Sequence, residues 1–164
     1  MRFYCMKSIK TLLGIGLLLL ISVSCETGSQ KNSYFFKAAQ IKDHPHPDQV
    51  KKIMKQEPDS AFHRLYFGKE IYVQLYYKED STEFRFNKDL SLKEVIINKP
   101  SLKYSPESIT YFGLTYQEPN QKDSAAYFSW KNQYDGFDII NFYKVGSKKT
   151  NGNYVYKIYF KLKN

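Results

Sequence analysis

The stretch YVYKIYFKLK, residues 154–163, decides the fold class because two kinds of side chain alternate along it. Three of its odd-numbered positions are lysine, namely Lys157, Lys161 and Lys163. Successive side chains of a β-strand point to opposite faces of the sheet, so the pattern predicts a strand with one buried and one solvated face. The predicted buried side consists of the even-numbered positions: Tyr154, Tyr156, Ile158, Phe160 and Leu162.

The same period of two recurs through the body of the chain. Residues 71–78 read IYVQLYYK, and a polar turn over 78–81 leads into a second predicted strand. Further apolar positions that share a predicted face are Phe84 with Phe86, Val95 with Ile97, Ala126 with Phe128 and Trp130, and Ile140 with Phe142. With 15 Tyr and 12 Phe, the composition also favours pleated sheet. We expect an α+β fold whose antiparallel sheet has about six to eight strands with two short helices; the alternative is a β-sandwich or barrel.

Two short helices are predicted, each followed by similar residues. Pro47 and Asp48 begin the first, and Pro58 lies beyond its end; Ser105 and Pro106 begin the second, and Gly113 follows it. QEPDSA at 56–61 is matched by QEP at 117–119 and DSA at 123–125. The order of signals predicts two helix-plus-meander repeats, 47–98 and 105–163, with chance similarity of two β-rich stretches as the alternative.

The N-terminus has the pattern of an export signal. Basic residues, among them Lys7 and Lys10, precede an apolar run over residues 12–23. As a helix this run would be about 18 Å long, whereas a membrane core is about 30 Å thick. The run is followed directly by Ser24 and Cys25, and a basic segment, a short apolar run and small residues are typical of a secretory signal peptide.

Because Val23 and the small residue Ser24 directly precede Cys25, residues 1–25 resemble a bacterial lipoprotein signal. The resemblance implies a cleaved signal peptide over 1–24, a diacylglyceryl group on the Cys25 sulfur and acylation of its new amino group. Residues 25–33 are then the lipidated Cys and a flexible tether, and 34–164 a compact β-rich domain, either in the periplasm or exposed at the cell surface. Glu26, following the Cys, favours the outer membrane by the same resemblance. The alternative is an ordinary thiol after a conventional cleavage site.

The order of helix, Pro-containing turn and antiparallel meander over residues 47–163 is similar to the tandem module of β-lactamase-inhibitor-protein-like domains. It also resembles the single module of the small lipoproteins of the outer-membrane assembly machine. This resemblance implies that the domain binds another envelope protein with its open sheet face and is not an enzyme. A glycan- or small-ligand-binding lipoprotein is the competing hypothesis, since tyrosine rings also stack on sugars.

Charge and motifs exclude several other classes. With the signal removed, 22 of the 25 Lys and Arg remain against 16 Asp and Glu. This excess of positive charge would favour contact with anionic lipid, or it only keeps a β-protein soluble. The sequence contains no nucleic-acid-binding motif. The lysines of residues 157–163 are expected to protect an exposed sheet edge or to attract an acidic partner. His44 and His46 lie between Asp43 and Asp48, but the prolines keep this stretch extended, so we expect a stiff linker and assign no metal, cofactor or catalytic residue.

Overall fold

A computed structural model describes residues 36–66, 69–123, 126–144 and 154–164, which all lie within the unit Lys31–Asn164. The helical elements are α1 (Ala38–Ile41), α2 (Pro47–Met54) and the 3₁₀ helix η1 (Pro106–Phe112). The strands are β1 (Ser60–Tyr66), β2 (Lys69–Tyr77), β3 (Thr82–Phe86), β4 (Leu92–Asn98), β5 (Gln121–Asp123), β6 (Tyr127–Lys131), β7 (Phe137–Lys144) and β8 (Val155–Leu162). Within these ranges, no helix is both long and apolar enough to cross a membrane.

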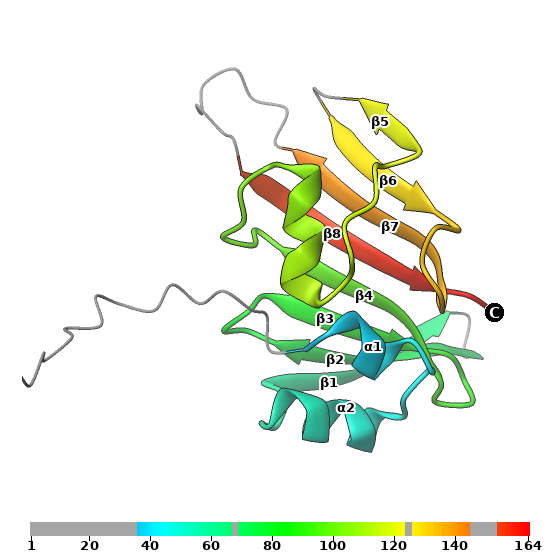
Figure 1. The fold of residues 1–164 in the computed structure, drawn as a ribbon. Helices are drawn as coiled ribbons and strands as arrows, with labels where there is room; N and C mark the ends of the chain where they lie inside the picture. Colours follow the sequence, from blue (N-terminus) through cyan, green and yellow to red (C-terminus); the bar gives the residue numbers. More distant parts are fainter. Residues whose placement is uncertain (1–35, 67–68, 124–125, 145–153) are drawn as a thin grey trace, which may run out of the picture. The chain divides into compact units, whose positions relative to one another are not determined.

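The strands form one open antiparallel sheet in the order β1-β2-β3-β4-β8-β7-β6-β5 (Figure 1). Each half of the sheet is a four-stranded meander, and the halves join where β4 pairs with β8, with Ile97 opposite Ile158. The expected α+β fold with an antiparallel sheet is therefore confirmed. The alternative of a sandwich or barrel is wrong, because β1 and β5 lie at opposite ends of the sheet and do not pair with each other.

The helices pack on one face of the sheet (Figure 1). Phe36, just before α1, lies 5.6 Å between ring centroids from Phe84 of β3, and Phe112 of η1 lies 5.0 Å from Phe160 of β8. Val50 and Met54 of α2 are buried in the same cluster. Large aromatic side chains fill this single core, and their edge-to-face contacts are the geometry that aromatic rings prefer.

The predicted helix starts are found, with one change of type. α2 begins at Pro47 as predicted, and the backbone N–H of His46 donates to Gln49 Oε1 at 2.8 Å, which satisfies a group that the first helical turn leaves unpaired. The second element is a 3₁₀ helix rather than an α-helix. Ser105 precedes it, but its hydroxyl donates to the Glu107 carboxylate and makes no hydrogen bond to the backbone of the helix.

The structure corrects the predicted face of the last strand at its beginning. Tyr154 and Tyr156 are 62% and 46% exposed, whereas Val155 is buried. The cause is an irregularity in the register of β7 and β8 between Tyr143 and Lys144, which shifts the alternation before Lys157. From Ile158 to Leu162 the predicted face is right.

Other differences concern short or exposed elements. Ala126 lies outside β6 and is exposed, so only Phe128 and Trp130 of that predicted trio belong to the strand. α1, β1 and β5 are not predicted from the sequence. All three are short or lie at an edge, where few buried positions leave a periodic signal.

Candidate functional site: the open face of the sheet

The face of the sheet opposite the helices carries polar and aromatic side chains; we call it the open face. In the described residues no helix packs on it (Figure 1). Cross-strand pairing aligns one residue from every strand in a row: Ser60, Tyr76, Glu83, Ile96, Tyr159, Asn141, Ser129 and Gln121. The adjacent row consists of Phe62, Gln74, Arg85, Glu94, Lys161, Ile139 and Lys131.

A charged cluster occupies the middle of the open face. Arg85 lies between two carboxylates, with Nη2 2.9 Å from Glu83 Oε2 and Nη1 3.7 Å from Glu94 Oε2. Tyr159, from the neighbouring β8, is hydrogen-bonded to Glu94, and burial together with this carboxylate raises the pKa of the Tyr159 hydroxyl. Side chains tied to one another in this way form a fixed polar surface.

The lysines of β8 lie on this face, but they do not protect an edge. β8 is an interior strand between β4 and β7, so the expectation of edge protection is wrong. Lys161 Nζ lies 2.7 Å from Asp138 Oδ2 and holds the pKa of that carboxyl below its usual value. Lys157 Nζ lies 6.0 Å from the centroid of the Tyr143 ring, and Lys163 follows the strand and is exposed.

Smaller side chains are buried beneath their neighbours on the open face. Gln74, Ile96 and Ser129 are only 7%, 5% and 3% exposed. Asn141 Nδ2 lies 2.8 Å from the Tyr143 hydroxyl. The face is therefore a mixed surface of half-buried tyrosines, paired charges and buried amides, with Phe62 as its exposed apolar residue, rather than a continuous apolar patch.

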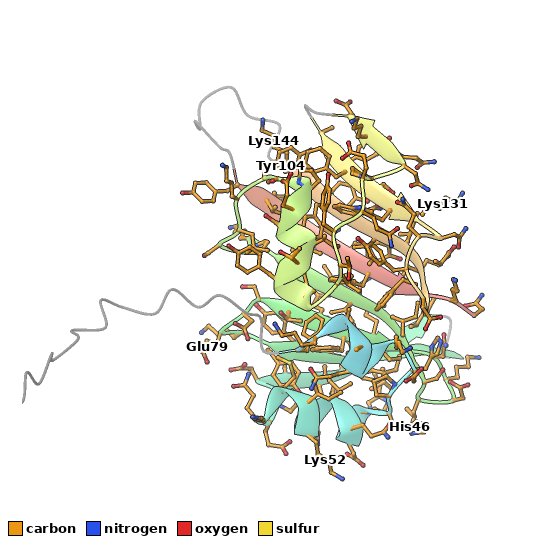
Figure 2. The ribbon with its side chains drawn as sticks, viewed as in Figure 1. His46, Lys52, Glu79, Tyr104, Lys131 and Lys144 are labelled. Carbon is orange, nitrogen blue, oxygen red and sulfur yellow. The ribbon has the colours of Figure 1, made fainter. Side chains whose placement is uncertain are left out.

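The helix side of the sheet carries one aromatic stack and one small hollow. Tyr104 stacks on Phe128 at 4.5 Å between ring centroids, and Lys144 Nζ lies 5.3 Å from the Tyr104 ring (Figure 2). A hollow of about 300 Å³ near α1 is lined by Leu114, Tyr134 and other residues. Its lining also includes the ion pair of Lys42 and Asp135, whose N–O distance is 2.7 Å.

The histidine-rich linker makes structural contacts. His44 Nδ1 lies 2.8 Å from the Leu92 carbonyl oxygen, and His46 directly precedes α2 at the surface (Figure 2). Across the described ranges, no three His, Cys, Asp or Glu side chains are grouped so that they could hold a metal ion. His63 is exposed on β1. Glu79 lies in the turn between β2 and β3, more than thirty residues along the chain from His44 and His46.

The sequence indicates the tyrosine-rich strands, the lysines of β8 and Gln74 as one alternating position of residues 71–78, but it does not single out Arg85 or Asn141. Alternation shows that these residues share the solvated side of their strands, but the pairing of β4 with β8 that brings them onto one surface is not visible in the sequence. Cys25, the predicted lipid attachment site, lies outside the described residues. In comparison with known proteins, no family model, curated protein or solved structure matches the chain.

Proposed function

We propose that this chain is a lipid-anchored protein of the bacterial cell envelope that binds another protein through the open face. The observation that carries the proposal is that, among the residues the structure describes, no helix lies on a face spanning eight strands, while α1, α2 and η1 pack on the opposite face. On that face, tyrosines and paired charges from several strands contact one another.

The composition of the open face suits a protein partner. Tyrosine and arginine are enriched in protein interfaces, because they offer large contact area together with hydrogen bonds. Tyr76, Tyr159 and Tyr143 are half-buried on three different strands, and Arg85 lies among them. Since Tyr159, Tyr143 and Arg85 already contact neighbouring side chains, a partner would order few of them on binding.

The order of elements supports a duplicated module as part of the same proposal. Helix and four-stranded meander occur as α2 with β1–β4, and again as η1 with β5–β8. We propose that residues 47–98 and 105–163 are two copies of one unit, joined at the pairing of β4 with β8. The matching tripeptides QEP, at 56–58 and 117–119, lie at corresponding points, after the helix and before the first strand of each half.

The anchor is tested separately from the binding. We expect the mature protein to begin at Cys25, to carry acyl chains and to fractionate with the outer membrane. Metabolic labelling with a palmitate analogue and mass measurement of the mature N-terminus check this. A Cys25→Ala variant should lose the label and leave the membrane fraction, because two or more acyl chains are needed for stable anchoring. An unmodified N-terminus in the native protein would reject the anchor.

Binding is tested by photo-cross-linking in intact cells. A benzophenone amino acid at the exposed Phe62 of the open face should give a defined protein adduct, identified by mass spectrometry. The same amino acid at Lys52, exposed on α2, is the matched control and should not give that adduct (Figure 2). Equal adducts at both positions, or none at position 62, would contradict a protein-binding open face.

A further inference from the structure

Lysines and exposed tyrosines gather at one end of the sheet, where β4 and β7 end and β8 begins; we call this group the lysine–tyrosine rim. Its members are Lys99, Lys103, Lys144, Tyr154, Tyr156 and Lys157. The Lys99 N–H donates to the Tyr156 carbonyl oxygen at 2.6 Å, and Lys103 is bridged to Tyr154. These contacts continue the junction of β4 with β8 beyond its last regular pair, and Lys144 ends β7 beside them.

The positive charge of the rim is not neutralised by carboxylates. Within the ranges that the structure describes, none of its four lysines makes an ion pair. Towards the opposite end of the sheet, a hydrogen bond from Lys161 and the charges of Lys131 and Lys163 lower the pKa of the Asp138 carboxyl, so lysines there face a carboxylate. The acidic residues at the end of the rim belong to neighbouring elements: Glu79 and Asp80 to the β2–β3 turn, Glu107 to η1 and Asp123 to β5. The unpaired lysines of the rim favour an anionic partner.

The tyrosines of the rim indicate what kind of anionic partner it fits. Tyr154 and Tyr156 are 62% and 46% exposed, and Lys144 Nζ lies 5.3 Å from the centroid of the Tyr104 ring (Figure 2). Tyrosine combines an apolar ring with a polar tip, and lysine combines an apolar stem with a charged head. Both side chains are typical of the interface between a membrane and water, where the apolar part sinks below the headgroups and the polar part stays among them.

The described chain starts within reach of this end of the sheet. Phe36 packs on Phe160 in the middle of β8, and Lys42 then pairs with Asp135 in the β6–β7 turn, at the end opposite to the rim. The chain therefore runs away from the rim as it enters the sheet (Figure 1). Ten residues separate Phe36 from Cys25. A chain of this length spans at most about 38 Å, and about 18 Å with random-coil statistics. A membrane that holds the acyl chains of Cys25 is thus close enough for the rim to contact it.

We propose that the lysine–tyrosine rim rests on the anionic phospholipid headgroups of the membrane in which Cys25 is anchored. The strands then meet the membrane end-on, so both faces of the sheet stay clear of it and the open face is presented sideways to a protein partner. Attraction between lysines and anionic lipid adds up over the four side chains and acts only within about a Debye length of the surface, which the tether keeps near. This inference rests on the proposed lipid anchor and adds the orientation of the domain.

The test uses the full-length acylated lipoprotein in phosphatidylcholine vesicles with or without about 30% phosphatidylglycerol, which supplies the surface charge. Acylation of Cys25 and removal of Cys5 with the signal leave the thiol of a Ser101→Cys variant as the single labelling site. A fluorophore there, within the rim, should be quenched by headgroup-spin-labelled lipid roughly threefold more in the anionic vesicles. The same fluorophore in Asn132→Cys, exposed in the β6–β7 turn at the opposite end, is the matched control and should be quenched equally in both kinds of vesicle.

Removing the charges shows whether the lysines cause the contact. The rim variant carries Lys99→Gln, Lys103→Gln, Lys144→Gln and Lys157→Gln in the Ser101→Cys background. Its quenching in anionic vesicles should fall to the level seen with phosphatidylcholine alone, and about 0.5 M NaCl should have the same effect on the unsubstituted rim, because salt screens exposed charges. A control variant with the same net charge carries Lys88→Gln, Lys93→Gln, Lys131→Gln and Lys163→Gln, near the opposite end, and should keep the enhanced quenching.

The outcomes separate this inference from the proposed function. If the native protein carries no acyl chains, the lipid anchor fails, and this inference fails with it. If the protein is anchored but the labels at positions 101 and 132 are quenched alike, only the inference is overturned. Quenching at position 101 that does not depend on phosphatidylglycerol, or that persists in the rim variant, would also overturn it, because contact would not then come from the lysines and anionic headgroups.

Discussion

The ring of Phe160 in β8 is the point where the core contacts of this protein converge. It is fully buried, and its centroid lies 5.0 Å from Phe112, 5.8 Å from Phe137 and 6.1 Å from Phe36. We expect Phe160→Ala to lower the free energy of unfolding by about 3–5 kcal/mol, because it leaves a cavity between elements that cannot close around it. Tyr156→Ala, on the same strand but 46% exposed, should cost less than about 1 kcal/mol. Urea denaturation measures both; equal losses would show that Phe160 is not central.

A second prediction at the scale of the residue concerns two glycines with positive φ. A Cβ at Gly136 (φ +78°) would lie 2.5 Å from Lys42 Cβ and 3.0 Å from the Lys42 carbonyl oxygen, whereas one at Gly113 (φ +74°) would meet the flexible Lys37 side chain at 3.3 Å. We expect Gly113→Ala to cost about 1 kcal/mol through its backbone conformation alone. Gly136→Ala should lower the free energy of unfolding by about 1–3 kcal/mol more than Gly113→Ala does, because the backbone of Lys42 must move to make room for the methyl group. Thermal unfolding of the two variants compares them, and the reverse order of Tm would be inconsistent with this packing.

At the scale of the element, α2 ends on a residue in the left-handed region. Lys55, its C-cap, has φ +56° and ψ +27°, a conformation that glycine adopts without the steric cost of a Cβ. We expect Lys55→Gly to stabilise the protein by about 0.5–1 kcal/mol. Lys52→Gly, three residues earlier and exposed inside the helix, should destabilise it by about 1 kcal/mol. Chemical denaturation of this pair checks the helix end; a loss of stability in both variants would place the end elsewhere.

Elements with strong periodicity could be predicted from the sequence, and those without it could not. Pro47 and Asp48 indicate the start of α2, and Phe84 with Phe86, both buried on one side, indicates β3. β1 is not predicted from the sequence; residues 61–63, the part of it after Ser60 whose burial is described, are all exposed and show no alternation of burial. Simple alternation predicts the wrong side for Tyr154 and Tyr156, because the pairing of β7 with β8 is irregular between Tyr143 and Lys144, opposite the start of β8.

The candidate site was less predictable than the elements that form it. Each half of the open face follows from local alternation, but the two halves meet only through the antiparallel pairing of β4 and β8, as between Ile96 and Tyr159. These strands are about sixty residues apart in sequence, and long-range pairing leaves no signal in a single local pattern. The network of Arg85, Glu94 and Tyr159, which spans that junction, could therefore be found only in the folded structure.

At the scale of the whole molecule, the last strand in sequence is an interior strand of the sheet. β8 pairs with β4 on one side and β7 on the other, whereas β5 is a three-residue edge strand with every residue exposed. Opening β8 separates the two meanders, so its amides can exchange with solvent only when the sheet as a whole unfolds. Opening β5 disturbs one neighbour. Protection should therefore be highest at β4 and β8 and fall towards both edges.

Hydrogen exchange followed by mass spectrometry tests this gradient directly. Peptides covering 155–162 and 92–98 should exchange slowest, with protection close to the free energy of global unfolding, and the peptide covering 121–123 should exchange within the first time points. Ile158→Ala, which weakens the pair with Ile97 at the junction, should speed exchange in β2 as well as β7, because both meanders depend on the same strand. If only the β5–β7 side became faster, the two meanders would be independent units, and a face continuous across eight strands could not act as one binding surface.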